Sequence, residues 1–151
     1  MAEIDNINKK ILNNIQVNFP LSSRPYKIIA KQLDISEDEL IQRVAQMKED
    51  LFIRRIGGNF SPDKLGYYST LCAAKVSEKK LKLFIETVNA CSGVTHNYKR
   101  DHQFNIWFTF IAPSIEIIEQ NLNEISQKTG VETLLNLPAT KVFKISANFK
   151  L

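Results

Sequence analysis

Both histidines of the sequence, His96 and His102, lie in one segment, THNYKRDHQFNIWFT, at residues 95–109. The same segment contains Tyr98, Arg100 and Trp107. An imidazole can ligate the iron of a haem-type group or move protons near neutral pH. Trp and Tyr rings can cover a flat macrocycle, and Arg matches a carboxylate with two parallel hydrogen bonds. These residue types therefore indicate a site for a flat polycarboxylate such as a tetrapyrrole.

The spacing within this segment predicts a β-hairpin with its turn at residues 99–102. Strand alternation then separates two faces of the second strand. The core face is expected to carry Phe104, Ile106, Phe108 and Phe110. The opposite face is expected to carry Asn105, Trp107 and Thr109. Because cross-strand neighbours share a face, we expect His96 and Tyr98 of the first strand to lie beside Asn105 and Trp107.

The chain before this segment predicts three helices. Apolar residues at helical spacing place the first helix at residues 5–17. Pro25 is suited to open the second helix, PYKIIAKQL. Ser36 is expected to cap the third helix, with Glu39 completing a capping box.

A β segment is predicted after the third helix, FIRRIGGNF at residues 52–60, with Gly57-Gly58 as its turn. Residues 1–62 are therefore predicted to form a winged helix-turn-helix domain. Arg54 and Arg55 of this segment could contact phosphate, or they could equally hold a carboxylate ligand.

Residues 63–151 are predicted to form a second domain with the ferredoxin-like order β-α-β-β-α-β. The expected elements are a strand at 70–76, a helix at 78–89, strands at 94–98 and 103–111, a helix capped by Ser114, and a last strand region between residues 131 and 145. A sheet of this kind has helices on one face only, so its other face is free for a partner or a flat ligand. The fold class is α+β, and the layout resembles that of the Lrp/AsnC regulators.

The charge of the third helix argues against DNA recognition. The second helix of a working helix-turn-helix inserts its amino-terminal residues into the major groove, where Lys and Arg supply much of the affinity. Residues 36–50 instead contain five acids and two bases, a net charge of −3. We therefore expect this helical domain to serve packing rather than DNA binding.

The bulk composition is compatible with several partners. The formal net charge is +4 with a pI near 9.1, which favours an acidic partner: nucleic acid, a membrane surface or a polycarboxylate. Cys72 and Cys91 are far apart and predict two small thiols in a reducing compartment. We find neither a signal peptide nor an apolar run approaching the roughly 18 residues of a membrane span, and we expect a cytoplasmic protein with no membrane contact.

Four segments together resemble the siroheme decarboxylase family, which serves alternative haem biosynthesis and, in close relatives, haem d1 synthesis. These segments are FPLSSRPY (residues 19–26), IRRIGGNF (53–60), LGYYSTL (65–71) and THNYKRDHQFNIWFT (95–109). The last is the most specific, and the resemblance spans nearly the whole chain. It implies an Lrp-like fold used by an enzyme that removes the acetate carboxyls on C12 and C18 of siroheme, giving 12,18-didecarboxysiroheme.

The resemblance also implies a homologous second subunit, usually in a heterodimer, and no cofactor beyond the iron of the siroheme substrate. The motif histidine maps onto His96, as proton donor or as ligand of the substrate iron, with Tyr98 as its helper. The predicted substrate-binding residues are Arg100, His102, Asn105, Trp107, Arg54 and Arg55. No other metal site is expected.

Two rival functions are compatible with the sequence. The first is an Lrp/AsnC-type transcriptional regulator whose ligand is a haem or an amino acid. The second is a tetrapyrrole-binding subunit that has no activity itself and serves an active partner. A sequence-specific, salt-dependent DNA shift would favour the regulator, and a spectral change without turnover would favour the binding subunit.

Overall fold

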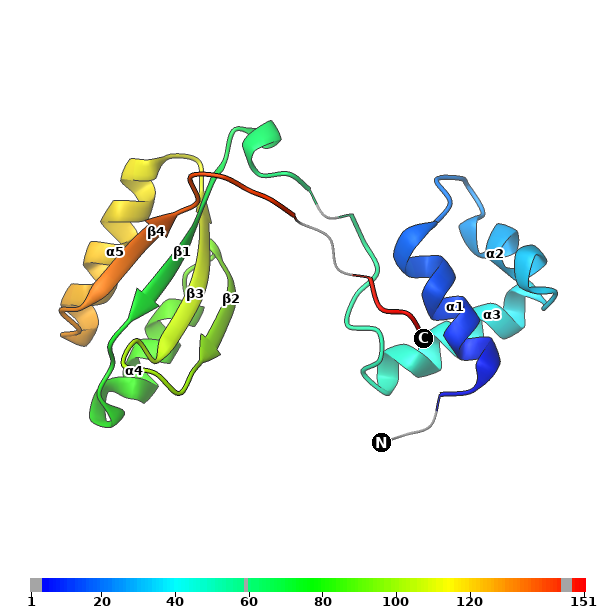
Figure 1. Ribbon diagram of the computed structural model, residues 1–151, viewed down its shortest axis with the longest axis horizontal. Coiled ribbons are helices and arrows are strands. Elements are labelled where there is room, and N and C mark those ends of the chain that lie inside the picture. Colours follow the sequence, from blue (N-terminus) through cyan, green and yellow to red (C-terminus); the bar gives the residue numbers. More distant parts are fainter. Residues whose placement is uncertain (1–3, 59, 145–147) are drawn as a thin grey trace. The chain divides into compact units, whose positions relative to one another are not determined.

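The chain folds into two compact units in the computed structural model, which describes residues 4–58, 60–144 and 148–151 (Figure 1). The helical unit comprises Met1–Gly58 with Lys144–Leu151, and the sheet unit comprises Asn59–Phe143. The predicted second domain, 63–151, therefore differs at its C-terminal end. The reason is that the side-chain amide of Gln16, in the first helix, bonds the backbone of the C-terminal segment. Gln16 Nε2 donates to the carbonyl of Phe149 at 2.6 Å, and its Oε1 accepts from the Phe149 amide at 3.0 Å.

Three helices form the helical unit: α1 (Asn6–Val17), α2 (Pro25–Leu33) and α3 (Glu37–Glu49). All three were predicted. The Ser36 hydroxyl accepts from the Glu39 amide at 3.1 Å, as the predicted cap requires. A shared apolar core holds the helices together, formed by Ile11, Ile29, Ala30, Leu40, Val44, Met47 and Ile53.

The predicted wing is wrong for the residues that the structure describes, because residues 53–58 contain no strand. Leu51 adopts a φ of 63° and turns the chain back onto α3. The Ile53 amide then donates to the carbonyl of Met47 at 3.1 Å, and the Ile53 side chain packs into the helical core. This segment is therefore bound to α3 rather than extended into a hairpin; Asn59 lies outside the described residues.

The sheet unit has the predicted ferredoxin-like order. Its elements are β1 (Tyr68–Ala74), α4 (Glu78–Asn89), β2 (Val94–Lys99), β3 (Ile106–Ala112), α5 (Ile115–Thr129) and β4 (Leu134–Pro138). The strands lie in the order β2-β3-β1-β4, and all pairs are antiparallel. The last strand is shorter than the predicted region, whose end at Ile145 falls outside the described residues.

One face of the sheet is covered by α4 and α5 (Figure 1). Strand β3 supplies Ile106, Phe108 and Phe110 to this core, as its alternation predicted. The helices contribute Phe84 and Ile118, among others, to the same buried cluster. Among the helices that the structure describes, none is long and apolar enough to span a membrane.

Candidate functional site

Three side chains of the β2 strand and its end form a stacked series, called here the β2 triplet: His96, Tyr98 and Arg100. The His96 and Tyr98 rings lie 6.1 Å apart between centroids, with an angle of 24° between their planes. The guanidinium carbon of Arg100 lies 6.0 Å from the Tyr98 centroid, within cation–π range. All three side chains are exposed. The triplet therefore presents an imidazole, an aromatic ring and a fixed cation along one line.

The strand register places His96 and Tyr98 on the sheet face that no helix covers, and Arg100 lies beside Tyr98. Tyr98 lies opposite Trp107, and His96 lies opposite Thr109. A register shift between Val94 and His96 marks a bulge, and regular pairing with β3 begins at His96. The predicted proximity of Tyr98 and Trp107 is confirmed, whereas His96 faces Thr109 directly and reaches Trp107 only diagonally.

The loop between β2 and β3 spans residues 100–105 and is called here the 100–105 loop. It is longer than the turn predicted at residues 99–102, and its end falls inside the strand predicted at 103–111. Its polar atoms are bound internally. The Phe104 amide donates to His102 Nδ1 at 3.2 Å, and the Phe104 carbonyl accepts from Trp107 Nε1 at 2.7 Å. His102 Nδ1 therefore acts as the acceptor of this hydrogen bond.

Asn105 does not join the open face as predicted. Its Oδ1 accepts from the Val76 amide at 2.9 Å, and its Nδ2 donates to the Val76 carbonyl at 2.8 Å. Both halves of the amide bond the backbone of this one residue, which lies between β1 and α4. The sequence pattern predicted the wrong direction for this side chain because strand alternation applies only inside a strand, and β3 begins at Ile106.

Leucines extend the open face beyond the triplet, and the sequence analysis missed them. Leu71 of β1 lies opposite Leu137 of β4, and both share the face of Thr109 and Trp107. Leu71, Leu135 and Leu137 are 43%, 37% and 40% exposed. The alternation of Leu135 and Leu137 around a polar Asn136 was the available signal. So much exposed leucine on one sheet indicates a surface that binds another molecule.

Arg54 and Arg55 belong to the helical unit, whereas the β2 triplet belongs to the sheet unit. Both are exposed and line a cavity of about 760 Å³. Its walls are mainly apolar and include Leu12, Ile15 and Phe19 of the helical unit. Apolar walls with two guanidinium groups suit a molecule that combines an apolar body with carboxylates.

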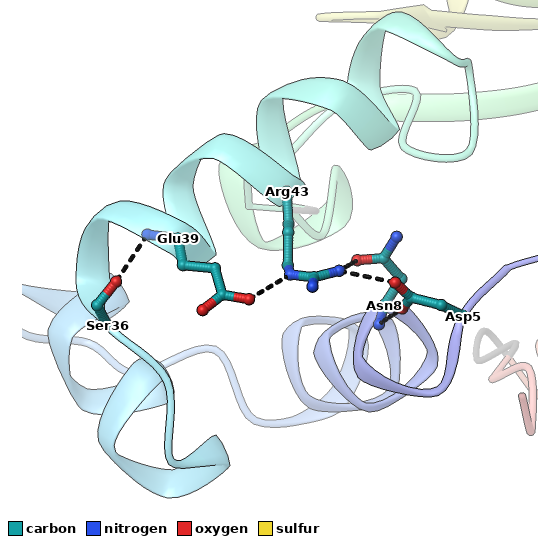
Figure 2. Close-up of polar contacts among 5 residues, drawn as sticks. All are labelled: Asp5, Asn8, Ser36, Glu39 and Arg43. Atoms are coloured by element: carbon teal, nitrogen blue, oxygen red, sulfur yellow. Dashed lines mark hydrogen bonds and ion pairs between the residues drawn. The ribbon is translucent and has the colours of Figure 1, made fainter.

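Arg43 of α3 is held by the amino-terminal end of α1 (Figure 2). Its Nη1 donates to Asp5 at 2.8 Å and to Asn8 at 3.1 Å, and its Nε donates to Glu39 at 2.9 Å. The hydrogen bonds from the Asn8 amide and from Arg43 hold the pKa of the Asp5 carboxyl below its usual value. Because one of the two basic side chains of α3 is neutralised in this way, the helix is poorly suited to bind phosphate.

The described residues contain no group of three or more His, Cys, Asp or Glu that could hold a metal ion. Cys72 is a buried free thiol, and burial raises its pKa to about 12. Burial also raises the pKa of Cys91. Both thiols are therefore protonated near neutral pH and are poor nucleophiles.

Comparisons with known proteins agree with this division. The Siroheme decarboxylase NirDL-like HTH domain family matches residues 8–54, and the AsnC-like ligand binding domain family matches residues 64–144. AsnC of E. coli is similar in fold, with a TM-score of 0.80 at 23% identity over 99% of each chain. The chain thus combines a helix-turn-helix with an AsnC-like ligand-binding domain.

Relatives with higher sequence identity indicate a more specific family within this class of protein. The siroheme decarboxylase alpha subunit of Desulfovibrio desulfuricans is 49% identical over 151 residues, covering 100% of this chain and 87% of the relative. The siroheme decarboxylase NirDL, crystallised in co-complex with an iron-uroporphyrin III analogue, is 32% identical with a TM-score of 0.67. This chain is covered to 94% and spans 48% of that longer chain. The chain belongs to the siroheme decarboxylase family.

Proposed function

We propose that this chain is an alpha-type subunit of a siroheme decarboxylase and removes the acetate carboxyls on C12 and C18 of siroheme, giving 12,18-didecarboxysiroheme. The observation that carries this proposal is the β2 triplet beside Trp107 on an open sheet face. That face offers aromatic surface for a macrocycle and a cation for its carboxylates. The 49% identity to a siroheme decarboxylase alpha subunit over the whole chain supports both the activity and the subunit type.

The proposed reaction breaks the bond between an acetate methylene carbon and its carboxylate carbon, and carbon dioxide leaves. The electron pair of that bond stays on the methylene carbon, where the conjugated macrocycle spreads the charge. One proton then joins this carbon and gives a methyl group. Because atoms and electrons balance without an oxidant or reductant, we propose no cofactor besides the iron that siroheme carries.

His96 is the proposed catalytic residue, with Tyr98 as its helper. The His96 Nδ1 lies 3.1 Å from the Thr95 hydroxyl, and Nε2 takes part in no hydrogen bond among the described contacts. In this position the imidazole either delivers the proton or faces the substrate iron. Tyr98 stacks on the imidazole and supports its orientation.

The arginines are proposed to hold the carboxylates that do not react. A tight ion pair to the reacting acetate would stabilise the ground state and slow the loss of carbon dioxide. Arg100 is therefore assigned to a neighbouring peripheral carboxylate. Arg54 and Arg55 are assigned the same task from the helical unit, where they adjoin an apolar cavity.

The open sheet face is also proposed to bind a homologous second subunit. Leu71, Leu135 and Leu137 form an apolar area that a related sheet could cover. A partner placed there would enclose the edge of a macrocycle lying against Tyr98 and Trp107. Such enclosure excludes water and strengthens the electrostatic interactions of the site. We place this assembly in the cytoplasm.

The test is a turnover assay under anaerobic conditions. The purified chain, alone and with its co-expressed partner subunit, is mixed with siroheme, and product mass is followed. We expect the loss of two carbon dioxide units from each siroheme in at least one pairing. No mass loss in any pairing sinks the enzyme proposal. A Soret-region change without mass loss favours the binding subunit that serves an active partner.

A further inference from the structure

The Asn105 side chain bonds the backbone of Val76, in the position where a continued β3 strand would pair with it. The β1–β3 pairing ends at Ala74 and Ile106, so continued pairing would set Val76 opposite Phe104. Val76 is 4% exposed, and its backbone amide and carbonyl need partners. The Asn105 side chain supplies both, at 2.9 and 2.8 Å. A side-chain amide has one acceptor and a donor, as a backbone residue does.

Because the Asn105 side chain bonds Val76, the backbone of Phe104 is available to other partners. Its amide donates to His102 Nδ1, and its carbonyl accepts from the Trp107 indole. The His102 and Phe104 rings stack with centroids 6.1 Å apart. If the Phe104 backbone paired with Val76 instead, its amide and carbonyl could not bond the His102 and Trp107 rings. The direction of His102 and Trp107 therefore depends on Asn105.

The first residues of the 100–105 loop are also attached near the junction of β1 and α4. Lys99, the last residue of β2, forms an ion pair of 2.9 Å with Glu78 in the first turn of α4. The Arg100 amide donates to the backbone carbonyl of Asn105 at 2.8 Å and closes the loop. Both stems of the 100–105 loop are thus attached next to the junction of β1 and α4.

We propose that Asn105 is a positioning residue for ligand binding: by bonding the Val76 backbone it holds Trp107 and Arg100 on the open sheet face and fixes the position of His102 in the loop. It does not itself contact the ligand. This inference rests on the proposed function for the identity of the ligand, and its structural part is independent of that function.

The experiment compares Asn105→Ala with Gln103→Ala in the full chain. Gln103 is an exposed amide of the same loop and makes no hydrogen bond among the described contacts, so it is the matched control. Trp107 is the only tryptophan of the sequence, and its emission reports the loop without a ligand. Siroheme turnover with the partner subunit gives kcat and KM, and iron-uroporphyrin III serves as the binding probe.

In Asn105→Ala we expect emission at longer wavelength and stronger acrylamide quenching. We also expect a KM, and a dissociation constant for the probe, raised about tenfold, the usual cost of an unpaired buried polar group, with kcat changed less than about threefold. Gln103→Ala should match the wild type in every measurement. An Asn105→Ala variant that matches the wild type, or a Gln103→Ala variant that shows the same losses, overturns the proposal.

Asn105→Asp keeps the acceptor for the Val76 amide and loses the donor to its carbonyl. We expect an intermediate emission shift and an intermediate KM from this variant, and it decides the matter if Asn105→Ala fails to fold. Asn105→Asp with wild-type emission and probe binding overturns the proposal. If the wild type does not decarboxylate siroheme, emission and probe binding still test the positioning role, and only the proposed function fails.

Discussion

The helical unit and the open sheet face use their polar side chains in opposite ways. In the helical unit, Arg43 binds Asp5, Asn8 and Glu39, so its charge is satisfied within the fold (Figure 2). On the sheet face, the β2 triplet stacks on itself and takes part in no ion pair among the described residues. Polar groups bound internally stabilise a fold, whereas a row of exposed, oriented polar groups is available to a ligand.

This difference argues against DNA recognition by helix α3. A recognition helix must direct its basic side chains outward to phosphate. Helix α3 begins with Glu37, Asp38 and Glu39, and its Arg43 points into an internal network. Helix α3 therefore has the position of a recognition helix without its outward basic charge.

The largest expected effect comes from His96→Ala, which tests the sheet side of this comparison. We expect siroheme turnover to fall by at least about a hundredfold, since a positioned acid or base contributes that much or more. The midpoint of thermal unfolding should stay unchanged, because the His96 side chain is exposed. Undiminished turnover in the folded variant removes His96 from catalysis and leaves the fold assignment standing.

The sequence predicted the elements of the sheet unit better than the directions of its side chains. Hydrophobic alternation identified the core residues of β3, and the cap at Ser114 was confirmed by its hydrogen bond to the Ile117 amide at 3.3 Å. The direction of Asn105 was not predictable, because it depends on the buried backbone of Val76, a contact 29 residues away in sequence.

Similar non-local contacts explain the errors in the helical unit. The capping box was half right: Ser36 caps α3, but the Glu39 carboxylate binds Arg43. The prediction of a wing was wrong because Ile53 packs in the helical core instead of pairing in a strand. The chemistry of the site followed from residue types in one short segment, whereas its geometry depended on a bulge near His96 that no spacing rule reveals.

Leu137→Asp is expected to have the next largest effect and tests whether the open face binds a partner subunit. A carboxylate in the middle of an apolar interface should weaken association with the co-expressed subunit at least about tenfold. The isolated chain should lose little stability, because Leu137 is already 40% exposed. Analytical ultracentrifugation of the pair gives the dissociation constant. Val142→Asp, with a side chain 59% exposed beyond β4, is the control for an added charge. Equal association of both variants contradicts the interface.

Arg43→Met tests the helical side of the comparison. In contrast to His96→Ala, it should lower stability and leave turnover unchanged. Its partners are partly exposed, so we expect a loss of about 1 kcal/mol in the free energy of unfolding of the helical unit. Denaturant unfolding followed by far-UV circular dichroism measures this loss. Turnover per folded molecule should remain at the wild-type level. A wild-type stability would show that the network in Figure 2 contributes nothing measurable.

The smallest effect is the acid dependence that Asp5 gives to the helical unit. Its carboxyl caps α1 through the Asn8 amide and binds Arg43, and both contacts lower its pKa from the ordinary value of 3.8. A lowered pKa in the folded state means that the unfolded state binds the proton more readily. The stabilisation is therefore complete above the unfolded pKa and is lost as the pH falls through the folded pKa.

Asp5→Asn isolates the charge from the cap. Asparagine retains an oxygen for the Asn8 amide but cannot titrate, so stability should fall less steeply below about pH 4 than in the wild type. Denaturant midpoints measured across this range give the two slopes. Parallel curves for wild type and Asp5→Asn would place the acid sensitivity elsewhere, and the internal pairing of Arg43 would then be a contact without an energetic role.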